Sequence, residues 1–204
     1  RYTLQAKKQT NGLFKIYEIP RYLPQKVLNK KIILGYDPNT FTEKYINIFF
    51  GKKFNLKSIN KNLVDSVSKR VSNKKSQSFY YLDKNIVGEN EKTKVRRVTK
   101  AIKDKKADLL FISAPENVAW LLNIRGYDCE YSPIPKARIL LTKSGKIYFF
   151  SDPYKVKTIK KKLSSNSINF HSFKEFYKIL NNIPKANFII DANSCSIFNQ
   201  RMIS

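Results

Sequence analysis

Short apolar runs alternate with polar and charged stretches along the whole chain, and this pattern predicts a succession of strands and helices. In the first part of the chain, runs of branched and aromatic residues predict strands over residues 13–18, 31–36 and 54–59. Apolar residues at helical spacing predict a helix over residues 42–50. We therefore expect this part to be α/β in character.

Residues 66–88 interrupt the pattern with a polar segment rich in Ser and Lys, and we interpret them as a linker. The segment contains one aromatic cluster, Phe79-Tyr80-Tyr81, close to Lys74 and Lys75. Such a cluster could stack on nucleic-acid bases, but packing between domains is the expected use.

The second part of the chain has a more regular pattern. Its predicted elements are, in chain order, a helix over 91–103, a strand over 107–113, a helix carrying 118–122, a hairpin of 138–141 and 146–150, helices opening at Asp152 and Ser172, a strand over 188–191 and a helix near Ser194. Capping signals mark three helix starts, because Ser113 and Ser172 each precede a Glu by three positions and Asp152 precedes a Pro. Trp120, the single tryptophan, is interpreted as a core anchor.

The chain has 204 residues, of which 42% are hydrophobic, so it can bury a core and is not a disordered tail, a collagen or a coiled coil. Its apolar runs fall far short of the roughly 20 residues that cross a bilayer, so no membrane partner is expected. Cys129 and Cys195 are interpreted as reduced, buried thiols of a cytoplasmic protein. Because the sequence begins at Arg1 and not at Met, we expect a piece of a longer protein.

The net charge of +25 favours anionic partners such as nucleic acid. However, Arg, which binds phosphate and guanine through its forked guanidinium, supplies only 8 of the 40 basic residues. The Lys residues lie in short runs scattered along the chain. We therefore expect a solvated, compositionally biased surface, and nucleic acid as an unlikely partner.

Motifs for catalysis or metal binding are missing from the sequence. His171 is the single histidine, and it has no acidic or Cys neighbour at ligand spacing. The sequence has no Gly-x-Ser-x-Gly elbow, no Walker loop and no Cys-x-x-Cys pair. The prediction is that this chain contributes no catalytic residue and no metal ligand.

Four segments carry a family resemblance. Residues 116–128, with the sequence ENVAWLLNIRGYD, resemble a hallmark of the second domain of three-domain Xaa-Pro aminopeptidases, the aminopeptidase P enzymes of the creatinase and prolidase superfamily. Residues 1–6 (RYTLQA), 35–38 (GYDP) and 62–65 (NLVD) resemble motifs of the same family, in the same order. The resemblance therefore covers nearly the whole chain.

This resemblance implies an α/β fold with a creatinase N-terminal-type, ribonuclease-H-like mixed sheet. Residues 1–65 would be the C-terminal part of a creatinase-like domain one, residues 66–88 the linker, and residues 89–204 a creatinase-like domain two.

The resemblance also implies a function. The chain would be the noncatalytic N-terminal region of a metalloaminopeptidase that releases the N-terminal residue before Pro, and it would be inactive alone. Its expected partners are its own C-terminal pita-bread catalytic domain, short peptides with Pro at the second position, and a second copy in a homodimer. In that family two divalent ions, usually manganese, are held in the catalytic domain, so no cofactor is expected in this chain.

The resemblance points to substrate-cleft candidates just after the helix that carries Trp120. These are Asn123, Arg125 and Asp128, with Arg1 as a further candidate. Polar residues in a tight loop can line a cleft, and Arg125 could face the cleft of the catalytic domain. Alternatively, Arg125 and Asp128 pair with each other or with the backbone and fix the loop.

Two other functions remain open at this point. The chain could be a catalytically inactive creatinase-like module that binds proteins, or, as a weaker alternative, a basic nucleic-acid-binding protein. The five metal ligands in downstream sequence would distinguish the enzyme from the binding module. Steeply salt-dependent retention on DNA would identify a nucleic-acid-binding protein.

Overall fold

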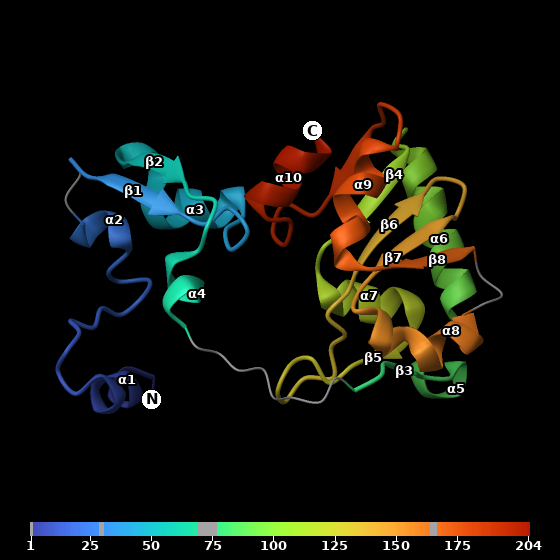
Figure 1. The fold of residues 1–204 in the computed structure, drawn as a ribbon, viewed down its shortest axis with the longest axis horizontal. Coiled ribbons are helices and arrows are strands. Elements are labelled where there is room, and N and C mark those ends of the chain that lie inside the picture. Colours follow the sequence, from blue (N-terminus) through green and yellow to red (C-terminus); the bar gives the residue numbers. More distant parts are fainter. Residues whose placement is uncertain (1, 29–30, 69–76, 164–166) are drawn as a thin grey trace. The chain divides into compact units, whose positions relative to one another are not determined.

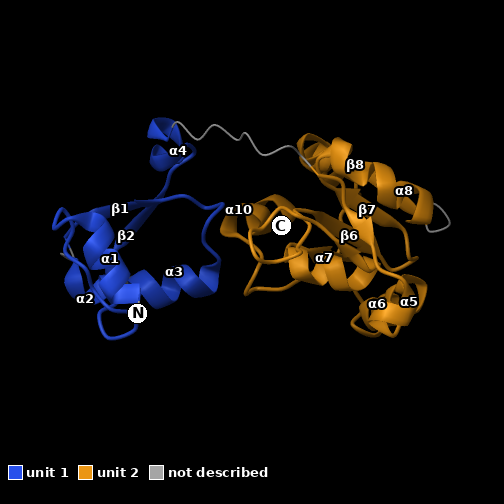
Figure 2. Cartoon of the chain, turned by 90° about the horizontal axis from the view of Figure 1, so that it is seen from below, with its two compact units in different colours: residues 1–68 blue, residues 69–204 orange. Residues whose placement is uncertain are grey.

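The computed structural model describes residues 2–28, 31–68, 77–163 and 167–204. The chain divides into two compact units, residues 1–68 and residues 69–204, shown in blue and orange in Figure 2. The second unit begins close after Ser68 and includes residues 77–88, which the sequence pattern had suggested as linker. Phe79 is 1% exposed there and packs in the core of that unit.

The first unit is built on a parallel pair of strands joined by a helix. Its elements are α1 (Tyr2–Thr10), α2 (Pro24–Val27), β1 (Ile33–Tyr36), α3 (Glu43–Phe50), η1 (Gly51–Lys53), β2 (Asn55–Ser58) and α4 (Leu63–Val67). Strand β1 pairs with β2 with Ile33 opposite Asn55, and Thr42 caps α3 by accepting a hydrogen bond from the backbone N–H of Tyr45. The predicted strands over 31–36 and 54–59 and the helix over 42–50 are confirmed.

The strand predicted over residues 13–18 is wrong, because this segment forms turns and irregular backbone. Leu13 is 83% exposed and Phe14 is 70% exposed. Branched and aromatic residues favour a strand only where a neighbouring strand supplies hydrogen bonds and packing. In the described part of this unit, β1 and β2 pair with each other and leave residues 13–18 without a partner strand.

The second unit contains a five-stranded sheet and a small two-stranded sheet. Its elements are β3 (Tyr80–Tyr81), α5 (Lys84–Val87), α6 (Glu91–Asp104), β4 (Leu109–Ile112), α7 (Pro115–Leu122), β5 (Ile124–Arg125), β6 (Arg138–Thr142), β7 (Ile147–Phe150), η2 (Pro153–Val156), α8 (Lys157–Leu163), β8 (Ile168–His171), η3 (Phe173–Glu175), α9 (Phe176–Asn181), β9 (Phe188–Ile190) and α10 (Ile197–Ile203). The strand order is β8-β7-β6-β4-β9, and β3 pairs with β5.

The five-stranded sheet is mixed, as expected. Strand β4 runs antiparallel to β6 and parallel to β9, and β7 runs antiparallel to β6 and parallel to β8. The predicted hairpin is β6-β7, and its tight turn includes Gly145 at a positive φ of 90°. Figure 1 shows the strands of this sheet side by side within the second unit.

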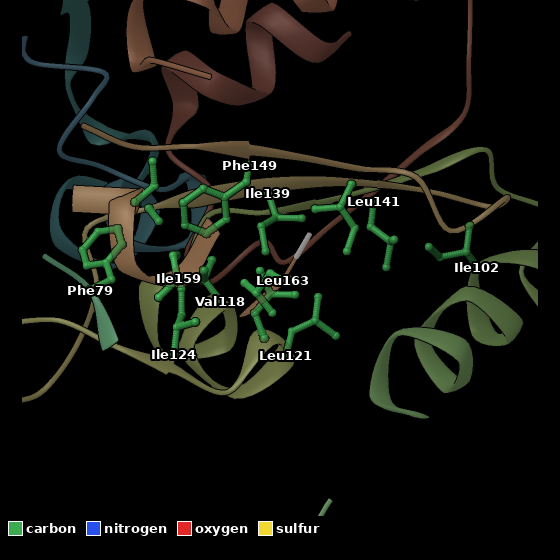
Figure 3. Close-up of a cluster of buried hydrophobic side chains, with 14 of the residues drawn as sticks. Phe79, Ile102, Val118, Leu121, Ile124, Ile139, Leu141, Phe149, Ile159 and Leu163 are labelled. Carbon is green, nitrogen blue, oxygen red and sulfur yellow. The ribbon is translucent and has the colours of Figure 1, made fainter. Parts of the chain in front are cut away.

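Apolar side chains fill both faces of the mixed sheet, because successive residues of a strand point to opposite faces. Ile139 and Leu141 of β6 belong to the cluster that also contains residues of α6, α7 and α8, and Figure 3 shows this cluster. The intervening Leu140 belongs to a second cluster with Phe176 and Leu180 of α9. The unit therefore has helices on both faces of one sheet, with a core on each side.

Of the capping boxes predicted at Ser113 and Ser172, the structure contains the one at Ser172. The Ser172 signal is confirmed, since the Glu175 carboxylate accepts hydrogen bonds from the Ser172 backbone N–H at 2.7 Å and from its hydroxyl at 2.8 Å. The Ser113 capping box is wrong, because Ala114 is the N-cap of α7 and Ser113 instead hydrogen-bonds the Ser194 hydroxyl at 2.9 Å. Proline at position 115 drives the preceding residue to extended backbone, which places the helix start there.

Two further interpretations from the sequence are wrong. Trp120 is 45% exposed and is not a core anchor; it lies under the cations of Lys94 and Arg97, with 4.9 Å and 5.6 Å from cation to ring centre. Cys129 is exposed, whereas Cys195 is buried as expected. Cys129 lies in the loop between β5 and β6, where the sequence pattern gives no burial signal.

Candidate functional site

Two of the predicted cleft residues, Asn123 and Arg125, lie where α7 ends and β5 begins. Asn123 is the C-cap of α7 and adopts the left-handed conformation, with φ 55° and ψ 34°. Asn is one of the few residues that adopt this conformation at low cost, so it can reverse the chain directly into β5. The sequence thereby places Arg125 two residues after a rigid helix end.

The side chain of Asn123 forms hydrogen bonds within the second unit. Its side chain is 1% exposed; Nδ2 donates to the Glu89 carbonyl at 2.9 Å, and Oδ1 accepts from Lys94 Nζ at 2.7 Å. Lys94 Nζ also donates to the Trp120 carbonyl at 2.9 Å. Burial of Lys94 lowers the pKa of its ammonium, although the charge of Glu89 opposes the shift. This buried network ties α6, α7 and the start of the loop together.

Arg125 is partly buried, and its Nη1 donates to the carbonyls of Ala119 at 3.2 Å and Ile124 at 2.9 Å. It pairs with the backbone and not with Asp128. Both hydrogen bonds use Nη1, and among the described residues no hydrogen bond to Nε or Nη2 is formed. The side chain is therefore anchored at one nitrogen and retains donors for another group.

Asp128 is held by two groups from other parts of the unit. Oδ2 accepts from the Lys136 backbone N–H at 2.6 Å, and Oδ1 forms an ion pair with Lys155 of η2. The side chains of Asp128 and Lys155 are only 12% and 14% exposed. A charge pair this shielded fixes the loop, because loss of one partner leaves the other charge buried alone.

The three described candidates have different hydrogen-bond partners. Asn123 and Arg125 both lie at the end of α7, Asp128 binds across to η2, and Arg1 lies outside the described residues. No sequence signal distinguishes Lys94 or Lys155 as a buried partner, because both occur among many other lysines. Only the packing of α6 and η2 shows that these two ammonium groups are shielded.

Asp128 also lines a cavity of about 580 Å³ in the second unit, with Cys129, Lys136, Arg138 and Tyr177 around it. The sequence analysis did not select Arg138, although an Arg at the start of an otherwise apolar strand can indicate a partly buried charge. Its guanidinium carbon lies 5.7 Å from the centre of the Phe173 ring, and its Nη1 is 3.4 Å from Asn199 Oδ1. Burial lowers the pKa of this guanidinium and raises the pKa of the Tyr177 hydroxyl.

No three His, Cys, Asp or Glu side chains gather within the described ranges in a way that could hold a metal ion. The interpretation that His171 has no acidic neighbour is wrong, because Glu175 lies one helical turn later with 3.5 Å from His171 Nδ1 to Glu175 Oε1. The His171 ring also stacks on Tyr148. None of the described helices has the length and apolar character of a membrane span. The described residues do not fit a site for two metal ions.

The mixed sheet with helices on both faces defines the second unit as an α/β domain. Residues 70–204 match the creatinase/prolidase N-terminal domain, and the chain belongs to this family. The fold and family implied by the sequence motifs are confirmed.

Two curated relatives that match most of this chain are named as Xaa-Pro aminopeptidases. A probable Xaa-Pro aminopeptidase P of Coprinopsis cinerea is 27% identical over 199 residues, covering 91% of this chain and 32% of the relative. Xaa-Pro aminopeptidase 1 of Dictyostelium discoideum is 24% identical over 205 residues, covering 91% of this chain and 32% of the relative. This chain therefore spans about a third of the length of these relatives.

A solved structure has a similar fold over part of this chain. The X-prolyl aminopeptidase of Caenorhabditis elegans, a cytosolic enzyme with a di-nuclear active site, superimposes with a TM-score of 0.67 at 26% identity. The superposition covers 76% of this chain and 26% of the enzyme. The matched part of this chain thus has the fold of a corresponding part of a much longer peptidase.

Proposed function

We propose that this chain is the noncatalytic N-terminal region of a metal-dependent Xaa-Pro aminopeptidase, which releases the N-terminal residue that precedes Pro. The observation that carries the proposal is the pattern of coverage: the match to an aminopeptidase P extends over 91% of this chain but only 32% of that relative. The catalytic residues and two divalent ions, manganese by family resemblance, would lie in a C-terminal pita-bread domain of the same polypeptide.

In this proposal the chain shapes the substrate cleft and contributes to a homodimer in the cytoplasm. Arg125 is the cleft candidate with the best support, because one nitrogen is anchored to backbone carbonyls while the rest of the guanidinium keeps its donors. Such a group could bind a peptide carbonyl or carboxylate without first breaking an ion pair. Asn123 and Asp128 would act by holding the loop in place.

The proposal is tested by expressing the complete polypeptide that contains this chain and assaying release of the first residue from Xaa-Pro peptides. We expect activity that is lost on chelation and restored by manganese, and none from the 204-residue chain alone. A complete polypeptide that folds but cleaves no Xaa-Pro peptide, with or without metal, would leave the inactive protein-binding module as the better explanation.

The role of Arg125 needs a separate experiment in the complete enzyme. Arg125→Gln should raise KM for short peptides by about tenfold while the metal content and kcat change little, because a binding contact is removed and not a catalytic group. Arg96→Gln, which removes the same charge from the exposed face of α6, is the matched control. Equal KM values for both variants would assign Arg125 to loop structure alone.

A further inference from the structure

The 580 Å³ cavity between the β5–β6 loop, the start of β6 and α9 carries positive charge that the described residues do not neutralise. Arg138 and Lys136 both line it. Neither side chain lies within 4.0 Å of a carboxylate in the described parts of the chain. The lining includes one acid, Asp128, and its carboxylate is already engaged by Lys155 and by the Lys136 backbone.

Arg138 is partly buried, whereas most of the described Lys and Arg residues of this chain are exposed. Its guanidinium lies over the Phe173 ring, so one face is against an aromatic wall and its N–H edge remains for hydrogen bonding. The printed contact to Asn199 is long, at 3.4 Å, and involves Nη1 alone. A shielded guanidinium with a neutral amide as partner lacks the counter-ion that usually accompanies a buried charge.

Hydroxyl donors and apolar walls complete the cavity. The lining residues include Ser113 and Tyr177, which carry hydroxyl groups, and Phe173 and Ile134, which are apolar; the Ser113 hydroxyl already forms a hydrogen bond with Ser194. The volume is within the range of roughly 300–1,000 Å³ found for small-molecule sites. Such sites combine mostly apolar walls with a few polar groups that orient the ligand.

From this geometry we infer that the cavity binds a carboxylate-bearing ligand, with Arg138 as the primary contact. The planar N–H edge of a guanidinium matches a carboxylate in a two-point hydrogen bond, which adds direction to the charge attraction. Lys136 at the exposed rim attracts the anion, and the Tyr177 hydroxyl donates a further hydrogen bond. The carboxylate could come from a small organic acid or from the C-terminus of a short peptide.

The inference goes beyond the proposed peptidase function and can be tested on the 204-residue chain itself. We would titrate the chain by calorimetry at constant ionic strength with succinate, inorganic phosphate, the peptide Ala-Pro-Ala and the same peptide with an amidated C-terminus. Constant ionic strength is needed because a chain with a charge of +25 attracts any anion weakly.

We expect saturable binding of succinate or of the free-acid peptide, and no binding of the amidated peptide. Binding of succinate alone identifies a small organic acid as the source, and binding of the free-acid peptide identifies a peptide C-terminus. Equal binding of the two peptides, tighter binding of phosphate than of either carboxylate, or no binding at all would overturn the inference.

Variants locate the site. Arg138→Gln should weaken binding by about tenfold, whereas Arg96→Gln, with the same charge change on an exposed helix face, should leave it unchanged. If Arg138→Gln does not fold, Tyr177→Phe and Lys136→Gln test the same cavity. Both should fold, because Tyr177→Phe keeps the aromatic ring and Lys136→Gln changes an exposed side chain. Undiminished binding in these folded variants would show that the anion lies elsewhere and would contradict the inference.

Discussion

The Nζ atom of Lys94 lies 2.7 Å from Oδ1 of Asn123, and the two side chains are only 4% and 1% exposed. Lys94 belongs to α6 and Asn123 ends α7, so this hydrogen bond joins two helices that pack on the same face of the sheet. It also fixes the residue from which the loop with Arg125 and Asp128 begins.

Asn123→Ala should lower the free energy of unfolding by about 2–3 kcal/mol, because it removes one of the two hydrogen-bond acceptors of Lys94 Nζ, removes the side-chain donor to the Glu89 carbonyl and forces Ala into a left-handed conformation. Asn123→Gly should cost less, since Gly adopts this conformation freely and loses only the hydrogen bonds. Urea unfolding measures both. Asn85→Ala, at an exposed site, is the control, and a similar small effect in all three variants would contradict the proposed role.

Tyr81 should make stability fall at alkaline pH. Burial, with a hydrogen bond to Glu91 at 2.7 Å, raises the pKa of its hydroxyl from 10.0 to about 12. Between these values the folded state holds a proton that the unfolded state has lost, so stability is complete below pH 10 and is lost as pH rises toward 12.

Tyr81→Phe removes this group and should make the chain less stable at neutral pH by about 1–2 kcal/mol, because the Glu91 carboxylate loses a donor. Its stability should then fall less steeply than that of the unmodified chain above pH 10. Thermal unfolding across this pH range provides the comparison. Parallel curves for the two proteins would show that Tyr81 does not cause the alkaline loss.

Gly126→Ala should destabilise the second unit by about 1–3 kcal/mol through overpacking. A Cβ at this position would lie 2.9 Å from both Phe79 Cδ1 and Pro135 Cα, and the second of these is backbone that cannot rotate away. Gly35→Ala is a milder comparison, because its added Cβ would meet Ile59 Cγ2 at 3.3 Å. Denaturant midpoints measure both; a larger loss for Gly35→Ala than for Gly126→Ala would argue against the tight packing described for Gly126.

The two cysteines should differ sharply in reactivity. Cys129 is exposed, whereas Cys195 is buried and its thiol pKa is raised to about 11 by burial. Because the thiolate is the reactive form, a disulfide reagent at neutral pH should modify Cys129 quickly and Cys195 only on unfolding. Cys129→Ser should abolish the fast phase and retain the slow one. Two fast phases in the native chain would mean that the core around Cys195 opens readily.

Local patterns in the sequence determined most of the regular elements. The hairpin β6-β7 and the helix α6 follow from apolar spacing within a few residues, and the cap at Ser172 follows from the chemistry of neighbouring groups. Short sequence motifs also indicated the family, and the match of residues 70–204 to the creatinase/prolidase N-terminal domain confirms it. These features depend on interactions that are close in sequence or on the order of motifs along the chain.

Only the tertiary structure decided which polar and aromatic side chains are shielded. Trp120 was expected in the core but is half exposed, and Lys94, one lysine among many, is buried beside it. Arg138 and Tyr177 come together from β6 and α9, which are distant in sequence, and so do Asp128 and Lys155. Burial of a charge depends on which elements pack around it, and periodicity within one element carries no information about that packing.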